Sequence, residues 1–236
     1  MLVHILLMDA AASPPEDEVL PRLHPEEQAR YRSFGHEQRR QTWLAGRALL
    51  LAALAKVTGE VDASLLRTAE SGGVRYADGA LHLSLSHSRG LLGAALASVP
   101  VGLDVEWPQP RLAVSQAERV YSPEEAAELA PLPPAEREDT FYAFWTLKEA
   151  ACKAMGLQLW QGLRHARFDL AAGRFFPQAP FPGGGWTCLH ARLEGGWRLG
   201  LAVRSPAPTQ VECLRLARRR RWHEETLVHP AWVYAR

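Results

Sequence analysis

The run Val-Gly-Leu-Asp-Val-Glu at residues 101–106 combines β-strand character with two carboxylates at alternate positions. In a strand, residues i and i+2 share a face, so Asp104 and Glu106 project together while Leu103 and Val105 face a core. Two adjacent carboxylates repel each other unless a cation lies between them, and Mg²⁺ prefers such oxygen ligands. The pattern predicts either a divalent-metal site or a plain strand face with two solvated acids.

On both sides of this strand the chain reads as helices followed by strands, which is typical of the α+β class. A helix is predicted over 37–56, ending at Gly59, and a second one over 135–155, closed by Gly156. A shorter helix is expected to start at Ser122-Pro123-Glu124-Glu125, with Ser at the N-cap, Pro at N1 and Glu at N3. Strands are expected near 1–8, 81–86, 91–98, 165–170, 186–194, 197–203 and 211–216, with Gly195-Gly196 as a hairpin turn. The seam falls near 101–110, so we expect two parts, residues 1–103 and 104–236.

Composition restricts the class of protein. Apolar residues make up 47% and charged residues 22% of 236, and the net charge is +1, so no strong overall field draws the chain to nucleic acid or anionic membranes. Three cysteines without a C-x-x-C pair argue against a disulfide framework or a zinc site and suit a reducing compartment. The apolar run 1–8 lacks a basic leader, and no apolar run approaches the ~20 residues of a membrane span. We therefore expect a cytoplasmic protein.

The helix over 141–155 carries charged residues at and within its apolar face. That face is formed at about 100° per residue by Phe141, Phe144, Trp145, Leu147, Ala151, Cys152 and Met155. Glu149 and Lys153 stack one turn apart at its edge, which is either functional or a surface ion pair of about 0.3–0.5 kcal/mol. Lys148 falls inside the apolar arc, so it must reach solvent or meet an anion.

Two further segments offer groups that hold phosphate. Ser86 and His87 end an alternating Leu/Ser strand ahead of Arg89-Gly90, where hydroxyl, imidazole and turn N–H groups can bind an anion or simply cap the strand. Ser86 is not in G-x-S-x-G, so a serine hydrolase is not indicated. The long N-terminal helix carries Arg39, Arg40 and Arg47, which form either an anion-binding face or a solvated one.

Taken in order, these segments resemble the 4′-phosphopantetheinyl transferase superfamily, in its long Sfp-like class. The matching stretches are SLSHS at 84–88, VGLDVE at 101–106, RVYSPEE at 119–125 and WTLKEAACK at 145–153. The likeness spans roughly residues 30–156. It implies a transferase that moves 4′-phosphopantetheine from coenzyme A to a serine hydroxyl of an acyl or peptidyl carrier protein, releasing 3′,5′-ADP.

The resemblance also implies roles for individual residues. Asp104, Glu106 and Glu149 are the expected ligands of Mg²⁺ (or Mn²⁺), Glu149 the expected base, acting directly or through water, and Lys153 a catalytic phosphate contact. The implied coenzyme A contacts are Arg39, Arg40, Arg47, Ser86, His87, Lys148 and Lys153. Where relatives carry G-K-P, this chain has Gly72-Gly73-Val74-Arg75, so either Arg75 replaces the lysine from a shifted position or one contact on the adenine side is lost.

By the same resemblance, the fold is expected to be two similar α/β halves related by a pseudo-twofold axis, with coenzyme A between them, in a monomer. An acidic carrier protein would dock beside residues 111–140, with Arg111, Arg119, Val120 and Tyr121 as contacts. No nucleic-acid or membrane partner is expected.

Two other functions remain open from the residues alone. One is a magnesium phosphodiesterase or nucleotidyltransferase that uses the same acids without a carrier protein. The other is a nucleic-acid-binding module at Arg218–Arg221, next to Trp222. Glu224 and Glu225 follow at once, and this favours a solvated strand edge over a phosphate grip.

Overall fold

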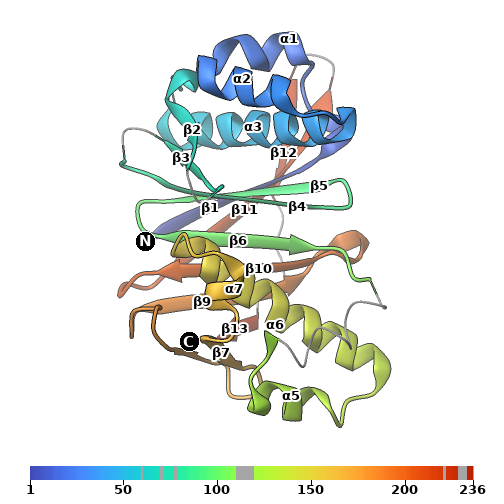
Figure 1. The fold of residues 1–236 in the computed structure, drawn as a ribbon, viewed down its shortest axis with the longest axis vertical. Coiled ribbons are helices and arrows are strands. Elements are labelled where there is room, and N and C mark those ends of the chain that lie inside the picture. Colours follow the sequence, from blue (N-terminus) through green and yellow to red (C-terminus); the bar gives the residue numbers. More distant parts are fainter. Residues whose placement is uncertain are drawn as a thin grey trace. The chain divides into compact units, whose positions relative to one another are not determined.

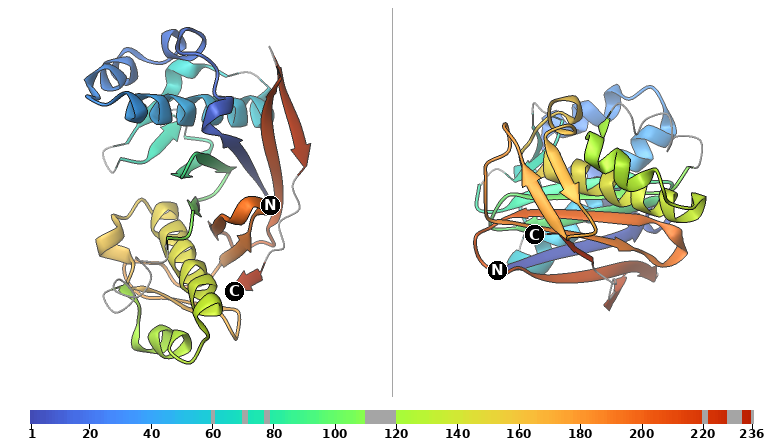
Figure 2. Two further views of the ribbon diagram at one scale, coloured as in Figure 1. Left: turned by 90° about the vertical axis from the view of Figure 1, so that its right-hand side faces the viewer. Right: turned by 90° about the horizontal axis from the view of Figure 1, so that it is seen from below.

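The computed structural model describes residues 1–59, 61–69, 72–76, 79–109, 120–219, 222–227 and 233–235. The chain forms two compact units, drawn in Figures 1 and 2. Met1–Val99 and Gln210–His229 make the first unit, and Pro100–Thr209 and Pro230–Arg236 the second. The predicted division at 103/104 is therefore wrong in one respect, because residues 210–229 belong with the N-terminal part. They return there because a strand near the C-terminus pairs with the first strand of the chain.

The first unit is built on a five-stranded sheet with the order β12-β11-β1-β5-β4. Its strands are β1 (Leu2–Asp9), β4 (His82–Ser88), β5 (Leu91–Ala97), β11 (Gln210–Arg219) and β12 (Trp222–Leu227). β1 pairs in parallel with β11, placing Leu2 opposite Gln210, and antiparallel with β5 on its other side. All seven residues of β5 are buried, as expected for a strand inside the sheet.

One long helix provides most of the core of the first unit. α3 (Glu37–Thr58) packs on β5 and β1 and ends at Gly59, whose φ of +80° suits glycine. Its buried leucines and alanines form one apolar cluster with side chains of the sheet. The smaller elements are η1 (Ala10–Ala12), α1 (Glu16–Val19), η2 (Leu20–Arg22), α2 (Pro25–Ser33), η3 (Ala63–Leu65), β2 (Leu66–Thr68) and β3 (Val74–Tyr76).

The second unit repeats the theme of a long helix on a sheet. Its four strands, β6 (Val101–Glu106), β9 (Trp186–Arg192), β10 (Arg198–Arg204) and β13 (Val233–Ala235), follow the order β13-β9-β10-β6 and are antiparallel. α6 (Pro134–Ala154) lies against β6 and β10. The remaining elements are α5 (Pro123–Leu129), α7 (Leu159–Gly162), β7 (Ala166–Asp169), β8 (Arg174–Pro177) and η4 (Glu194–Gly196).

The predicted α+β mixture of helices and strands is confirmed, whereas the pseudo-twofold relation between the halves stays a prediction. Ser122 caps α5 through a complete capping box with Glu125, as its sequence indicates. All three cysteines are buried and free. Among the described residues, no helix combines the length and apolar character needed to cross a bilayer.

Candidate metal centre and active site

Three carboxylates from two elements of the second unit meet at one point. β6 carries Asp104 and Glu106 on the same face, and α6 carries Glu149. One carboxylate oxygen of each residue lies within 4.8 Å of the others. Asp104 and Glu149 are buried and Glu106 is partly exposed. The structure thus brings together three acids that are up to 45 positions apart in the sequence.

Two glycines let the backbone of α6 approach the sheet closely enough for this meeting. A Cβ atom at Gly102 would lie 1.8 Å from the carbonyl oxygen of Ala150, and one at Gly200 would lie 2.4 Å from that of Thr146. No side chain fits either place, so the helix rests on bare strand backbone. Gly200 sits opposite Asp104 in the β10–β6 pair, which puts the close approach directly beside the acids.

A lysine from the next turn of the helix completes the cluster. Lys153 Nζ lies 2.6 Å from Asp104 Oδ1 and 3.5 Å from Glu149 Oε2. Burial lowers the pKa of Lys153, but the carboxylates of Asp104 and Glu149 more than offset this and raise it overall. The lysine is therefore charged at neutral pH, and three acids face one ammonium.

The electrostatics of Glu149 fit a site for a divalent cation. Burial, followed by the charge of Asp104, raises the pKa of the Glu149 carboxyl to about 8, with Lys153 acting in the opposite direction. Crowded carboxyl groups hold a proton when no cation is present. A hard ion such as Mg²⁺ can displace this proton and bind the carboxylate oxygens. The donor set of Asp104, Glu106 and Glu149 therefore fits the predicted ion.

Lys148 does not lie where the resemblance implied. None of its side chain is exposed, and Nζ donates to the carbonyl oxygens of Leu163 (2.8 Å) and Ala166 (2.6 Å). It also forms an ion pair with Glu125 at 2.8 Å. Because these acceptors occupy the ammonium and no surface remains, the expected phosphate contact of Lys148 is not supported. Lys148, the lysine in the apolar arc, is thus neutralised by the buried carboxylate of Glu125.

Glu125 is a residue whose importance sequence reasoning missed. Its Oε1 accepts from the backbone N–H of Phe168 at 2.8 Å, and its Oε2 accepts from that of Ser122 at 2.8 Å. With Lys148, this carboxylate ties α5, α6 and β7 together next to Glu149. The capping-box pattern marked Glu125 as a helix-start residue, but nothing in the pattern named its cation.

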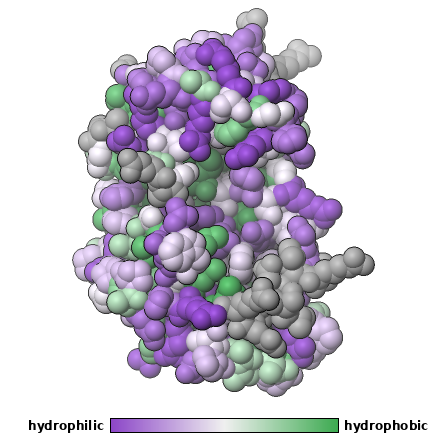
Figure 3. Space-filling model, viewed as in Figure 1, coloured by the Kyte–Doolittle hydropathy of each residue, from purple (hydrophilic) through white to green (hydrophobic). Residues whose placement is uncertain are grey.

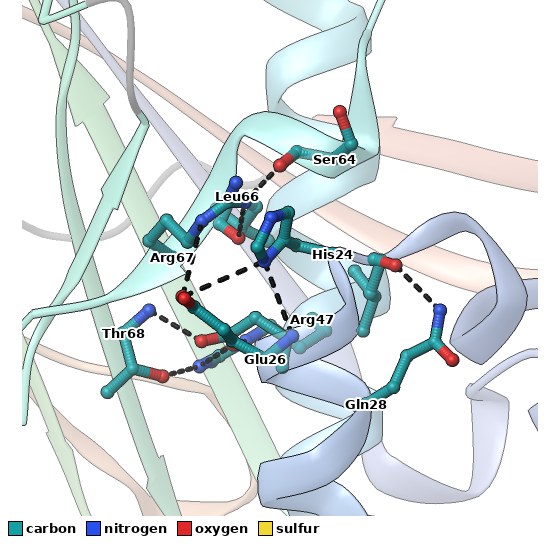
Figure 4. Close-up of polar contacts among 10 residues, drawn as sticks. His24, Glu26, Gln28, Arg47, Ser64, Leu66, Arg67 and Thr68 are labelled. Atoms are coloured by element: carbon teal, nitrogen blue, oxygen red, sulfur yellow. Dashed lines mark hydrogen bonds and ion pairs between the residues drawn. The ribbon is translucent and has the colours of Figure 1, made fainter.

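Arg47, in the first unit, also departs from its predicted role. It is buried, with Nε donating to Glu27 at 2.8 Å and an NH₂ group donating to Thr68 Oγ1 at 2.6 Å. Glu27 closes the ring by accepting from the backbone N–H of Thr68 at 2.7 Å. Figure 4 shows Arg47 and Thr68 in this network, beside the contacts of Glu26 and Arg67. A guanidinium held in this way joins α2, α3 and β2, and the expected coenzyme A contact of Arg47 is not supported.

The other predicted coenzyme contacts also lie in the first unit. Arg39 is exposed, with its guanidinium 4.8 Å from the Phe34 ring centre, and Arg40 forms an ion pair with Glu37 at 2.5 Å. Arg75 is exposed on β3, His87 is exposed at the end of β4, and Ser86 is buried one residue earlier. Their roles toward coenzyme A stay predictions.

The predicted docking segment lies partly outside the described residues, since Arg111 and Arg119 fall there. Tyr121 is buried, and its hydroxyl donates to the backbone oxygen of Phe141 at 2.8 Å. It is therefore a core residue, and the expectation that it contacts a partner is wrong, while Val120 is half-buried. Of the arginine run, Arg220 and Arg221 lie outside the described residues.

Comparisons with known proteins bear on the same part of the chain. A family model described as the 4′-phosphopantetheinyl transferase superfamily matches residues 100–202. The chain is 29% identical over 143 residues to a 4′-phosphopantetheinyl transferase of Bacillus subtilis, covering 60% of this chain and 63% of that protein. It is 33% identical over 157 residues to the 4′-phosphopantetheinyl transferase HetI of Nostoc, covering 64% and 62%. The transferase Sfp of Bacillus subtilis is 29% identical over 160 residues, covering 66% and 70%.

The match spans somewhat less than two thirds of the length of the first two relatives. The part matched by the family model, residues 100–202, includes the whole of β6 and α6, which carry the three acids and Lys153. The resemblance read from the sequence motifs is confirmed. Over residues 100–202, this chain matches the model of the 4′-phosphopantetheinyl transferase superfamily.

Proposed function

We propose that this protein transfers the 4′-phosphopantetheine group of coenzyme A to a serine hydroxyl of an acyl or peptidyl carrier protein and releases 3′,5′-ADP. The cluster of Asp104, Glu106, Glu149 and Lys153 is the observation that carries this proposal. The names of the relatives, all 4′-phosphopantetheinyl transferases, support it.

In the proposed reaction, the serine oxygen attacks the phosphorus that bears the pantetheine arm. A serine O–P bond forms, the P–O bond to 3′,5′-ADP breaks, and the serine proton passes to Glu149 directly or through one water. Without a metal ion, burial and the charge of Asp104 raise the pKa of the Glu149 carboxyl to about 8, and a bound cation would release that proton and leave a carboxylate that can accept one. Positioned acid–base help of this kind contributes ~10²–10⁴-fold to a rate.

Asp104, Glu106 and Glu149 would hold a divalent ion, which we propose to be Mg²⁺. Such an ion supplies charge neutralisation for the diphosphate and for the leaving group. Lys153 holds Asp104 and Glu149 in place, and its ammonium is close enough to the cluster to contact a phosphate oxygen. Asp104 thus both binds the ion and orients the lysine.

For the nucleotide we propose contacts from Arg39, Arg40, Arg75, Ser86 and His87. Arg39, Arg75 and His87 are exposed, so a ligand can reach their side chains. We further propose that the protein acts in the cytoplasm and that it is a monomer. Sedimentation of the purified chain would test the monomeric state.

The function is tested by incubating the protein with coenzyme A, Mg²⁺ and a panel of apo carrier proteins, followed by intact-mass measurement. The carrier should gain the mass of one phosphopantetheine arm, and Glu149→Gln should lose this activity. No mass gain on any carrier would contradict the proposal. Hydrolysis of small phosphodiesters without a carrier would favour a phosphoesterase that uses the same acids.

A further inference from the structure

A short turn after α6 displays an indole to solvent. Among the described residues, three large apolar side chains are exposed: Leu2 (46%), Leu159 (36%) and Trp160 (80%). Two of the three are neighbours in α7. The surface is otherwise mostly hydrophilic, with hydrophobic residues in small patches, as Figure 3 shows for one face. A single exposed apolar side chain is ordinary, but an indole and a leucine side by side form an apolar patch that a partner can cover.

The turn that displays Trp160 is firmly held. The backbone N–H of Gln158 donates to Gln161 Oε1 at 3.1 Å in a capping box, and that of Leu163 donates to the oxygen of Leu159 at 2.9 Å. A Cβ at Gly162 would lie 2.4 Å from Cys152 Sγ, so the turn packs tightly on α6. The exposure of the indole is therefore a property of a well-tied turn and not of a frayed end.

α7 is attached next to the metal cluster. Leu157, just before the turn, donates its backbone N–H to the oxygen of Cys152 at 3.0 Å. Cys152 lies between Glu149 and Lys153 on α6, about 4.5 Å along the helix axis from Glu149. A partner that contacts Trp160 is thus brought to the end of α6 that carries the reacting groups.

The charge around the turn favours an acidic partner. Apart from Lys153, whose ammonium is paired with Asp104 and Glu149, residues 150–168 contain Arg164, His165 and Arg167 and no aspartate or glutamate. Arg164 and His165, directly after α7, are exposed. A basic surface beside two exposed apolar side chains fits a protein surface that is acidic and has an apolar patch.

We propose that Trp160 and Leu159 form a docking contact for the acidic carrier protein that accepts the pantetheine arm, with Trp160 as the anchor. This inference rests on the proposed function. Tryptophan is enriched among the few residues that dominate binding energy at interfaces, and such anchors fill apolar pockets of the partner. Leu159 beside the indole distinguishes this surface from a simple stacking platform for a base, because a base covers one ring and leaves the leucine in water.

The test compares wild-type protein with Trp160→Ala, Trp160→Phe and the matched control Leu2→Ala, which removes an exposed apolar side chain from the first unit. KM for the apo carrier and KM for coenzyme A are measured separately, together with Tm. We expect Trp160→Ala to raise the carrier KM about tenfold or more, with partial recovery in Trp160→Phe. KM for coenzyme A and Tm should not change, and Leu2→Ala should behave as wild type. Calorimetric titration of the carrier into each variant gives the same comparison without turnover.

Two results would overturn the docking contact while the transferase assignment stands. One is an unchanged carrier KM in Trp160→Ala. The other is a raised KM for coenzyme A alone, which would assign the indole to the nucleotide. Absence of transfer in the wild-type protein is a different outcome, which would remove both the proposed function and the contact that rests on it.

Discussion

Adding one methyl group at Gly102 should open the metal centre. The Cβ of Gly102→Ala would lie 1.8 Å from the oxygen of Ala150 and 2.5 Å from the nitrogen of Ala154, whereas real Cβ contacts essentially never fall below 3.0 Å. Both clashing atoms are helix backbone, so no rotamer change relieves the overlap. α6 must therefore move away from β6 by at least about 1.2 Å, the difference between 3.0 and 1.8 Å.

This displacement acts on Glu149 directly, because Glu149 precedes Ala150 in the helix. Overpacking of this kind costs about 1–3 kcal/mol of unfolding free energy. In a chain of this size each kcal/mol corresponds to a fall in Tm of roughly 2–4 °C. A misplacement of about 1 Å in a reacting group costs on the order of 10²-fold in rate. Gly102→Ala should therefore lose far more activity than stability, and should bind Mg²⁺ more weakly.

The assay combines thermal unfolding, calorimetric titration of Mg²⁺ and transfer of the pantetheine arm. Gly183→Ala is the matched control in the same unit, because nothing lies within 4 Å of its added Cβ. If Gly102→Ala melts and binds Mg²⁺ as the wild type does, the close approach of helix and strand does not build the site. Equal losses in both variants would refute the reasoning as well.

Three further outcomes are expected. Lys148→Met should lose about 3–5 kcal/mol in urea unfolding, because Glu125 is left buried without its cation. Adding Glu125→Gln should recover most of this loss, and an equally unstable double variant would speak against the pair. With chelator present, the folded Glu149 carboxyl has a pKa of about 8 against an ordinary value of 4.5, so the folded state holds more protons between these pH values. Its contribution to stability is full below pH 4.5 and disappears toward pH 8, so wild type should lose Tm relative to Glu149→Gln as the pH rises; a constant difference would contradict the shift. Arg75→Ala should raise KM for coenzyme A if Arg75 replaces the missing lysine, and an unchanged KM would exclude that role.

The elements that position the site could be predicted because their signals are local. Alternation at residues 101–106 gave the strand bounds that the structure shows, and the 3.6-residue period located the apolar face of α6. The i, i+2 spacing placed Asp104 and Glu106 on one face, and their meeting with Glu149 followed from the family motif. Its cause, the missing side chains at Gly102 and Gly200, concerns the distance between a helix and a sheet, which periodicity does not report.

The sequence did not reveal the buried partners of Lys148 and Arg47, and the physical reason is the same for both. The pattern showed that Lys148 had to reach solvent or meet an anion. Its partner Glu125 lies 23 residues earlier, and the carbonyl groups that accept from Lys148 follow α7 in the sequence. Arg47 likewise finds Glu27 and Thr68, each about 20 residues away. A buried cation is identified by its tertiary neighbours, and spacing along one helix cannot tell a structural pair from a ligand contact.

The parallel pairing of β1 with β11 has a consequence for the order in which the protein is made. His4 and Glu212 are neighbours in this pair although they are 208 positions apart in the chain. On the ribosome, all strands of the second unit except β13 emerge before the first sheet can gain β11. Until then one side of β1 exposes its N–H and C=O groups, and such an edge invites pairing with other chains. Release of a chain cut after residue 209 should therefore yield an aggregating product, even though the cut removes none of the candidate catalytic side chains.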